Sequence, residues 1–166
     1  MWLCASIMSQ QLSTKVATVI NNRFIDLFPS PTPSLEDILA VPFDTLKGIG
    51  LSTAKTNYVR NVAAYFHEHN ITDQQLYALS DQEVKALLLP IKGVGKWTVE
   101  MLLMFALGRA DVFAVDDLGI QQAMTKIYGL DPSQKKAFKT EMERISATWQ
   151  PYRTYACLHL WKFKDA

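Results

Sequence analysis

The sequence predicts an all-α fold, and three features of its pattern support that prediction. Apolar residues recur at the three- and four-residue spacing of helices, and no stretch alternates apolar and polar residues as a half-buried strand does. Ser, Thr and Asp residues that suit helix N-caps precede many of these stretches. Pro and Gly residues interrupt them at their ends. We therefore expect a series of short helices that form one domain over residues 1–166.

Composition restricts the classes of protein to which the chain can belong. Of its 166 residues, 49% are hydrophobic, which is enough for a sizeable core. No apolar run is long enough to cross a membrane, and the apolar start at Met1 lacks the basic residues of a signal peptide. Cys4 and Cys157 are the only cysteines, so the sequence excludes a disulfide framework and a cysteine-ligated zinc or iron–sulfur site. We expect an intracellular monomer with no membrane partner.

Two helices open the chain. The apolar stretch Trp2–Ser9 predicts a buried helix, and a polar break at Gln10-Gln11-Leu12 follows it. Ser13 is placed to cap the second helix, which ends at the proline-rich stretch beginning at Pro29. The apolar face of this second helix is expected to consist of Val16, Ala17, Ile20, Phe24, Leu27 and Phe28.

Short helices and one long helix come next. Ser34 and Asp37 resemble a capping box at the start of a short helix that ends before Pro42. A longer helix is expected from Ser52 to His67. One side of this helix is expected to carry Ala54, Tyr58, Val62 and Tyr65. Further candidate N-caps are Asp44, Thr72 and Ser80, the last in a capping box with Glu83.

The rest of the chain is organised around a glycine hairpin. A helix from Ser80 to Leu88 leads into it, and Gly93 and Gly95 are expected to form a tight turn with positive φ. An apolar helix, Lys96–Leu107, follows. Bare backbone N–H groups at such a helix start suit a phosphate, and glycine at both positions would let the phosphate approach. The segment Lys47–Ala54 is an echo of this motif, or an independent connection that uses the same turn chemistry.

Two aspartates follow the apolar helix. Gly108 is expected to end that helix, and Asp116 and Asp117 stand at the start of the next one. The inward face of this next helix is expected to carry Ile120, Ala123, Met124 and Ile127, with Gly129 closing it. Asp131-Pro132 and Pro151 are expected to start the last two helices. A phosphate clamp and a carboxylate at opposite ends of one helix indicate chemistry on DNA.

Taken together, these motifs resemble the helix-hairpin-helix and aspartate signature of the base-excision DNA glycosylase superfamily, and within it the 3-methyladenine-DNA glycosylase II group. The resemblance runs through the segments Ile7–Ser13, Leu46–Ser52, Leu89–Thr98, Asp111–Ile120 and Trp149–Ala156. It implies two helical lobes with an active-site cleft between them. It also implies hydrolysis of the N-glycosidic bond of a damaged base that is flipped out of double-stranded DNA.

The resemblance implies that Asp117 is the catalytic residue. Breaking the glycosidic bond builds positive charge on the sugar, which a fixed carboxylate stabilises while it orients or deprotonates water. The family spacing, with an aliphatic residue three positions on, selects Asp117 with Ile120, and leaves Asp116 as a neighbour or an N-cap. The alternative is that both aspartates are ordinary helix caps.

The base pocket is assigned to aromatic residues by the same resemblance. Trp97 stands where glycosylases that also cut the DNA backbone carry a catalytic lysine, and Lys96 points about 100° away on the helix. A Schiff-base step is therefore not expected. Trp97 and Tyr152 match aromatic pocket residues of the alkylation-repair relatives, and Met101 lies one turn from Trp97. Aromatic faces suit a planar, cationic alkylated purine. Trp97 and Met101 are otherwise core residues.

The remaining assignments concern DNA and a cation. Gln11 matches the wedge that fills the gap left by the flipped base, and the DNA-binding hairpin residues are Gly93, Val94, Gly95, Lys96 and Thr98. Backbone carbonyls of Leu89, Ile91 and Val94 resemble those that hold Na⁺ or K⁺ in relatives, and we expect no required cofactor. The net charge is only +1, so basic contacts to DNA must come from local placement. Candidates are Lys47, Lys92, Lys96, Arg153, Lys162 and Lys164.

Two other functions stay open at this point. One is a non-catalytic helix-hairpin-helix DNA-binding module, and the other is a glycosylase for mismatched or oxidised bases. The chain also begins almost at the wedge helix, so we expect that it lacks the N-terminal segment that relatives usually add. The expected compartment is the nucleoid-containing cytoplasm of a bacterium or the nucleus of a eukaryote.

Overall fold

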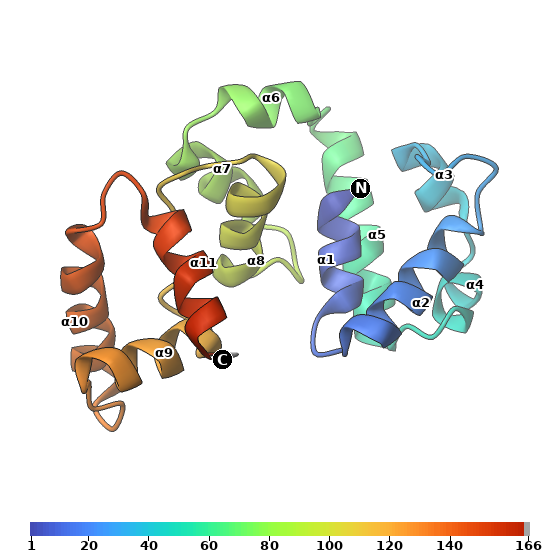
Figure 1. Cartoon of the computed structure of the whole chain (residues 1–166). Helices are drawn as coiled ribbons and strands as arrows, with labels where there is room; N and C mark the ends of the chain where they lie inside the picture. Colours follow the sequence, from blue (N-terminus) through green and yellow to red (C-terminus); the bar gives the residue numbers. More distant parts are fainter. Residues whose placement is uncertain (165–166) are drawn as a thin grey trace. The chain divides into compact units, whose positions relative to one another are not determined.

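The computed structural model describes residues 1–164, and the regular secondary structure of that part is entirely helical (Figure 1). This confirms the all-α prediction. The chain divides into two compact units, Met1–Val99 and Glu100–Ala166. Within the described residues, no helix has both the length and the apolar character needed to cross a membrane.

The first unit is built around its longest helix. Helix α5 contacts α1, α3 and α4, and α1 also packs on α2 (Figure 1). The helices of this unit are α1 (Trp2–Ser9), α2 (Thr14–Ile25), α3 (Leu35–Ala40), α4 (Phe43–Gly48), α5 (Thr53–Glu68), α6 (Asp73–Ala78) and α7 (Asp81–Leu88), followed by the start of α8 (Lys96–Met101). Fully buried side chains include Ile7, Met8, Phe24, Ile38, Leu46, Val59 and Leu88.

Most of the predicted N-caps are confirmed. The side chain of each accepts a hydrogen bond from a backbone N–H of the first turn, at Ser13, Ser34, Thr72 and Ser80. Ser52, where the long helix was expected to begin, caps α5 in the same way. Ser34 with Asp37 and Ser80 with Glu83 form complete capping boxes. The expected cap at Asp44 is wrong, because α4 already begins at Phe43 and Asp44 lies inside its first turn.

The predicted apolar faces of α2 and α5 are only partly buried. Val16 is exposed, and Leu27 and Phe28 lie beyond the end of α2. In α5 the buried residues are Thr56, Val59, Val62 and Ala63, whereas Ala54 is exposed. The buried side of α5 depends on where α1, α3 and α4 pack, and spacing along one helix does not contain that information.

The second unit contains α9 (Leu118–Tyr128), α10 (Lys135–Ala147) and α11 (Arg153–Lys164). Helices α9 and α11 pack against each other. The expected single helix Lys96–Leu107 is α-helical only to Met101 and continues as a π-helix over Leu102–Ala106. Accordingly, Leu107 N–H donates to Leu102 C=O at 3.0 Å, five residues back. Gly108 then ends it with φ +65°, as predicted.

Two other predictions fail in this unit. The helix expected at Asp131 begins at Lys135, because the Asp131 carboxylate accepts hydrogen bonds from the backbone N–H and hydroxyl of Ser133 and forms a turn instead. Ile127 was expected to point inward but is exposed, while Gly129 closes α9 in the left-handed conformation as predicted.

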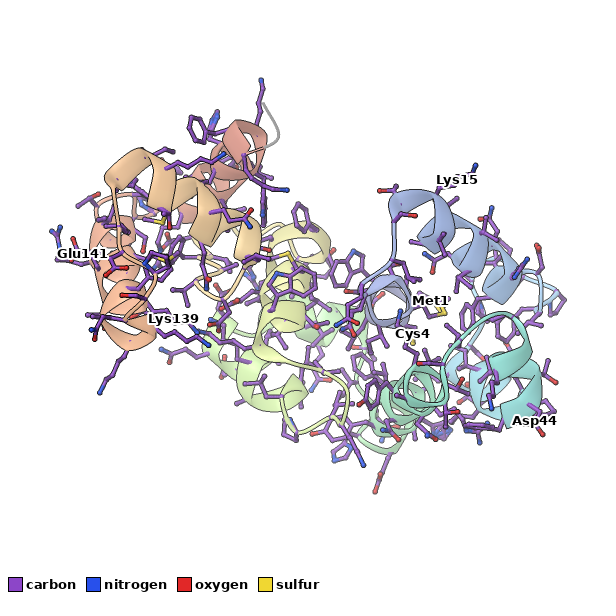
Figure 2. The ribbon with its side chains drawn as sticks, turned by 90° about the horizontal axis from the view of Figure 1, so that it is seen from below. Met1, Cys4, Lys15, Asp44, Lys139 and Glu141 are labelled. Atoms are coloured by element: carbon purple, nitrogen blue, oxygen red, sulfur yellow. The ribbon has the colours of Figure 1, made fainter. Side chains whose placement is uncertain are left out.

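Both cysteines are buried thiols. Cys4 lies on α1 (Figure 2), and burial raises its pKa to about 11. Burial likewise raises the pKa of Cys157 on α11 to about 11. Because the thiolate is the reactive form of cysteine, both side chains are unreactive core residues.

Candidate active site and nucleic-acid interface

The hairpin between α7 and α8 uses its two glycines for different purposes. Gly93 has φ +108°, and a Cβ at this position would fall on the ring of Tyr58 from α5. Gly95 does not have a left-handed φ, and a Cβ there would meet nothing within 4 Å. The expected positive φ at Gly95 is therefore wrong, because Gly93 alone makes the turn. Nothing inside the molecule requires glycine at 95, which leaves the approach of an outside group as the physical reason for it.

The predicted DNA-binding residues of the hairpin differ in exposure. Gly95 and Lys96 are exposed at the start of α8, and the C=O of Gly95 accepts the hydrogen bond of Val99 N–H at 3.1 Å. Val94 and Thr98 are buried. A contact from Val94 to DNA would therefore use its backbone.

Thr98 connects the hairpin to the predicted wedge. Its hydroxyl accepts a hydrogen bond of 3.2 Å from the side-chain amide of Gln10. The neighbouring Gln11 is exposed and has a left-handed φ of 57°. The first unit therefore brings the polar break and the hairpin together, with Gln10 turned inward and Gln11 on the surface.

The earlier echo of the hairpin has a different geometry. In Lys47–Ala54 the left-handed glycine is Gly50, with φ +110°, and Gly48 is the last residue of α4. A Cβ at Gly50 would lie 2.6 Å from Cδ1 of Ile20. The left-handed residue is thus the second glycine of this motif and the first glycine of the other. This favours two independent connections over a structural repeat.

The carbonyl groups that could hold a cation come from the same hairpin. The C=O of Ile91 accepts a hydrogen bond from Val94 N–H at 2.9 Å, which leaves one lone pair for another partner. Among the residues that the structure describes, no cluster of three His, Cys, Asp or Glu side chains could bind a metal ion. A cation at Leu89, Ile91 and Val94 would have backbone oxygens as ligands, which suits Na⁺ or K⁺, and this site stays a prediction.

Asp117 is the N-cap of α9 and is held by two donors. Its Oδ1 accepts hydrogen bonds from Ile120 N–H at 2.9 Å and from the indole N–H of Trp161 at 2.8 Å. The adjacent Asp116 instead pairs with Lys139 of α10, at 2.5 Å between Nζ and Oδ1. The two aspartates therefore have different environments, and the capping role falls on Asp117. Capping orients a carboxylate and does not prevent it from acting in catalysis.

Trp161 is the site residue that sequence reasoning missed. Its ring stacks on Phe105, with centroids 6.0 Å apart, and Phe105 belongs to the π-helical segment. A Cβ at Gly119 would lie 3.1 Å from both Asp117 Oδ1 and Trp161 Cδ1, so glycine leaves room for the contact between them. The sequence feature that could have identified it is a tryptophan within the last helix, since a partly buried indole N–H usually needs a hydrogen-bond acceptor.

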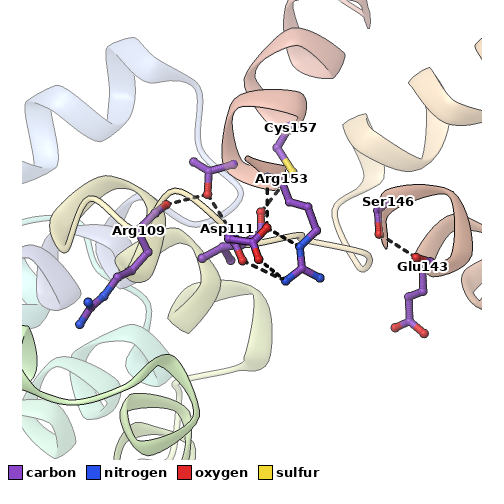
Figure 3. A network of polar contacts seen from close by, with 8 residues as sticks. Arg109, Asp111, Glu143, Ser146, Arg153 and Cys157 are labelled. Atoms are coloured by element: carbon purple, nitrogen blue, oxygen red, sulfur yellow. Dashed lines mark hydrogen bonds and ion pairs between the residues drawn. The ribbon is translucent and has the colours of Figure 1, made fainter. Parts of the chain in front are cut away.

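The loop that leads to Asp117 is fastened to the start of α11 (Figure 3). Arg153 donates from Nε to Oδ1 of Asp111 at 2.6 Å and from a terminal nitrogen to Oδ2 at 2.8 Å. The Thr154 hydroxyl donates to Arg109 C=O and accepts from Val112 N–H. The bond from Arg153 holds the pKa of the Asp111 carboxyl below its ordinary value. Arg153 was a candidate basic contact to DNA, which stays a prediction, and the structure gives it this supporting role.

The three residues expected in the base pocket differ in their exposure and in the unit to which they belong. Trp97 belongs to the first unit and is 38% exposed, which is unusual for a core tryptophan and favours a functional role. Met101 and Tyr152 belong to the second unit. Met101 is only 6% exposed, as a core residue would be. Tyr152 is 62% exposed, and its ring lies 6.2 Å from that of Tyr155.

Comparisons with known proteins agree on one family. Residues 4–148 match the family described as HhH-GPD superfamily base excision DNA repair protein. DNA-3-methyladenine glycosylase 1 of Schizosaccharomyces pombe is 35% identical over 166 residues, which covers 96% of this chain and 70% of that protein. The curated relatives are longer, and the chain spans 55% of one from Bacillus subtilis.

Solved structures give the same picture. The crystal structure of a DNA-3-methyladenine glycosidase from Bacillus halodurans is similar with a TM-score of 0.86 and 34% identity, covering 98% of this chain and 74% of that one. The S. pombe 3-methyladenine DNA glycosylase, solved in complex with abasic DNA, has a TM-score of 0.83 and 34% identity. That match covers 96% of this chain and 77% of the other.

Proposed function

The chain belongs to the HhH-GPD superfamily of base excision DNA repair proteins, and from that premise we propose that it is a monofunctional DNA glycosylase for alkylated purines of the 3-methyladenine type. Its substrate is double-stranded DNA with a damaged base, and its products are the free base and an abasic site. The observation that carries the proposal is the carboxylate of Asp117, held by the backbone of Ile120 and the indole of Trp161. The names of the relatives support the choice of substrate.

Asp117 supplies the chemistry of bond cleavage. As the bond between C1′ and the base nitrogen breaks, its electron pair leaves with the base and positive charge develops on the sugar. A fixed carboxylate stabilises that charge without reorganising in the transition state. Water then adds at C1′ and gives up a proton, and Asp117 orients the water or accepts that proton. The two donors to Oδ1 keep the carboxylate in one orientation while this happens.

Trp97 and Tyr152 select the base. Trp97 is 38% exposed and Tyr152 is 62% exposed, so an outside group can reach both side chains. An alkylated purine that carries a positive charge gains cation–π attraction from such a face, which a neutral base does not. Met101 contributes to the pocket wall or to the core. An indole at position 97 cannot form a Schiff base, so the abasic site leaves the enzyme with its DNA backbone intact.

The hairpin and the polar break hold the DNA. The N–H groups at the start of α8 bind a phosphate at Gly95, Lys96 adds a positive charge, and the exposed Gln11 enters the gap left by the flipped base. The backbone carbonyls of Leu89, Ile91 and Val94 would hold a Na⁺ or K⁺ ion, which would add a positive charge for binding phosphate. The protein acts as a monomer where cellular DNA lies, in the nucleoid of a bacterium or the nucleus of a eukaryote.

Incubation with DNA duplexes that carry one defined lesion, followed by identification of the released base, tests the proposal. Release of 3-methyladenine with an uncut abasic strand is expected. Release of uracil or 8-oxoguanine alone would instead indicate a glycosylase for mismatched or oxidised bases. Binding to all duplexes without release of any base would indicate a DNA-binding module.

A further inference from the structure

The polar break between α1 and α2 contains a strained residue. Gln11 has φ 57°, a left-handed conformation that costs free energy for any side chain other than glycine. Such a conformation persists only where the surrounding structure holds the backbone firmly. The contacts on either side of Gln11 therefore decide whether its exposed side chain keeps one direction.

A lysine of α5, which is distant in sequence but packs on α1, holds this backbone. The ammonium group of Lys55, in the first turn of α5, donates hydrogen bonds to the C=O of Met8 at 2.8 Å and to the C=O of Gln10 at 2.6 Å. These carbonyls lie at the C-terminal end of α1, where helical partners run out and the helix dipole is negative. Lys55 is half-buried, and burial lowers its pKa.

A second bond fixes the residue next to Gln11. The Gln10 amide donates to the buried hydroxyl of Thr98 in α8, so its side chain is turned away from the surface. Gln10 is thus held by its carbonyl through Lys55 and by its side chain through Thr98. With residue 10 held at both points, the exposed part of the break is Gln11 and the adjoining Leu12, and Gln11 is its exposed polar side chain.

We propose that Lys55 is a positioning residue for base flipping, which fixes the loop that carries Gln11 so that this side chain enters the duplex. The inference rests on the proposed glycosylase function and adds a residue to it. In the wild-type protein the loop is already ordered before DNA binds, because Lys55 holds it in the folded state. Without the ammonium group the loop relaxes toward ordinary φ values, and Gln11 must be ordered during the encounter with DNA.

A purely structural role for Lys55 predicts a different result. Loss of fold stability would lower base release from every substrate alike, because it removes active protein. A wedge-positioning role affects only substrates that need the wedge. A lesion that faces a normal base must be unpaired and the gap filled, whereas a lesion that faces an abasic-site analogue has no partner to separate from.

The experiment compares Lys55→Met with the wild-type protein on two duplexes, one with the lesion paired and one with the lesion opposite an abasic-site analogue. Single-turnover base release from the paired duplex should fall about tenfold, and release from the unpaired duplex about twofold or less, since flipping a base without a partner costs less. Lys55→Arg keeps the charge and the donors and should lie closer to wild type. Lys136→Met removes an exposed lysine of α10 as a matched control and should match wild type.

Two further measurements decide between the positioning role and a purely structural role of Lys55. Gln11→Ala combined with Lys55→Met should be no slower than Gln11→Ala alone, because both changes remove the same step. Fluorescence of a 2-aminopurine placed beside the lesion should rise on binding of wild type, and less for Lys55→Met. Equal slowing on both duplexes, additive effects, or an unchanged fluorescence rise would overturn the proposal. Absence of base release by wild type would refute the proposed function, and the fluorescence would still decide the role of Lys55.

Discussion

The glycine hairpin of the first unit and the carboxylate of the second are held by different kinds of contact. The hairpin turn is made by backbone hydrogen bonds over a few residues, such as Val94 N–H to Ile91 C=O, together with one left-handed glycine. Asp117 is held by an indole from a residue 44 positions further along the chain. A backbone turn presents N–H groups to any phosphate, whereas a carboxylate oriented by side chains serves one reaction. Changes at the hairpin should therefore alter affinity, and changes around Asp117 should alter rate.

Among substitutions that leave Asp117 in place, Trp161→Phe should have the largest effect. Phenylalanine keeps an aromatic ring to stack on Phe105 but removes the N–H that donates to Asp117. Misorientation of the carboxylate should slow base release about a hundredfold. Single-turnover release and DNA affinity are measured together. A loss of affinity with an unchanged rate would assign Trp161 to DNA binding and break the comparison.

Gly95→Val should weaken binding to every duplex, damaged or not, by about tenfold, or roughly 1.4 kcal/mol. A side chain has room at this position inside the protein, so the effect should come from the blocked phosphate. Gly48→Val is the matched control, because a Cβ at Gly48 also meets nothing within 4 Å and Gly48, like Gly95, is the glycine of its pair without a left-handed φ. Equal weakening by both variants, measured by fluorescence anisotropy, would show that both hairpins bind DNA.

Trp97→Ala should have a smaller and selective effect. Loss of cation–π attraction of about 0.5–2 kcal/mol should slow release of cationic 3-methyladenine, while release of neutral hypoxanthine should change less. Release of the two bases from otherwise identical duplexes is compared by chromatography. Equal losses for both bases would place Trp97 among the packing residues and remove it from base selection.

The smallest expected effect concerns the pH dependence of stability. Because the pKa of Asp111 is lowered by its bond to Arg153, the pair stabilises the fold above the ordinary carboxyl value of 3.8. That contribution should be lost as the pH falls through the lower folded-state pKa. The pair is partly exposed to solvent, so the change is small. Asp111→Asn should flatten the decline of the unfolding midpoint below about pH 4, and an identical decline in both proteins would contradict this.

Local chemistry explains which features could be predicted from the sequence. Helix caps such as Ser13, Ser34 and Ser80 accept from N–H groups three residues away, so the cap and its partner can be recognised together in a short stretch of sequence. The turn at Gly93 is local in the same sense. The prediction failed at Gly95 because either glycine could have made the turn, and the position of the Tyr58 ring on α5 is what requires glycine at 93.

The candidate site was less accessible to prediction because its contacts are distant in sequence. Family spacing selects Asp117, but the donor Trp161 lies on another helix and no spacing rule links the two. The π-helix that carries Phe105 also has no signature in the apolar pattern, which reads as a continuous helix. Arg153 was read as a surface charge, and only the fold brings Asp111 within reach of it.

Asp117, and not its neighbour Asp116, is proposed to perform the chemistry. Single-turnover release of 3-methyladenine by Asp117→Asn and by Asp116→Asn, each measured beside DNA affinity, tests it most directly. Asp117→Asn keeps the shape of the cap and removes the charge, so release should be abolished while affinity is retained. Asp116→Asn loses its ion pair with Lys139 and should release base nearly as fast as wild type. An inactive Asp116→Asn beside an active Asp117→Asn would assign the chemistry to Asp116.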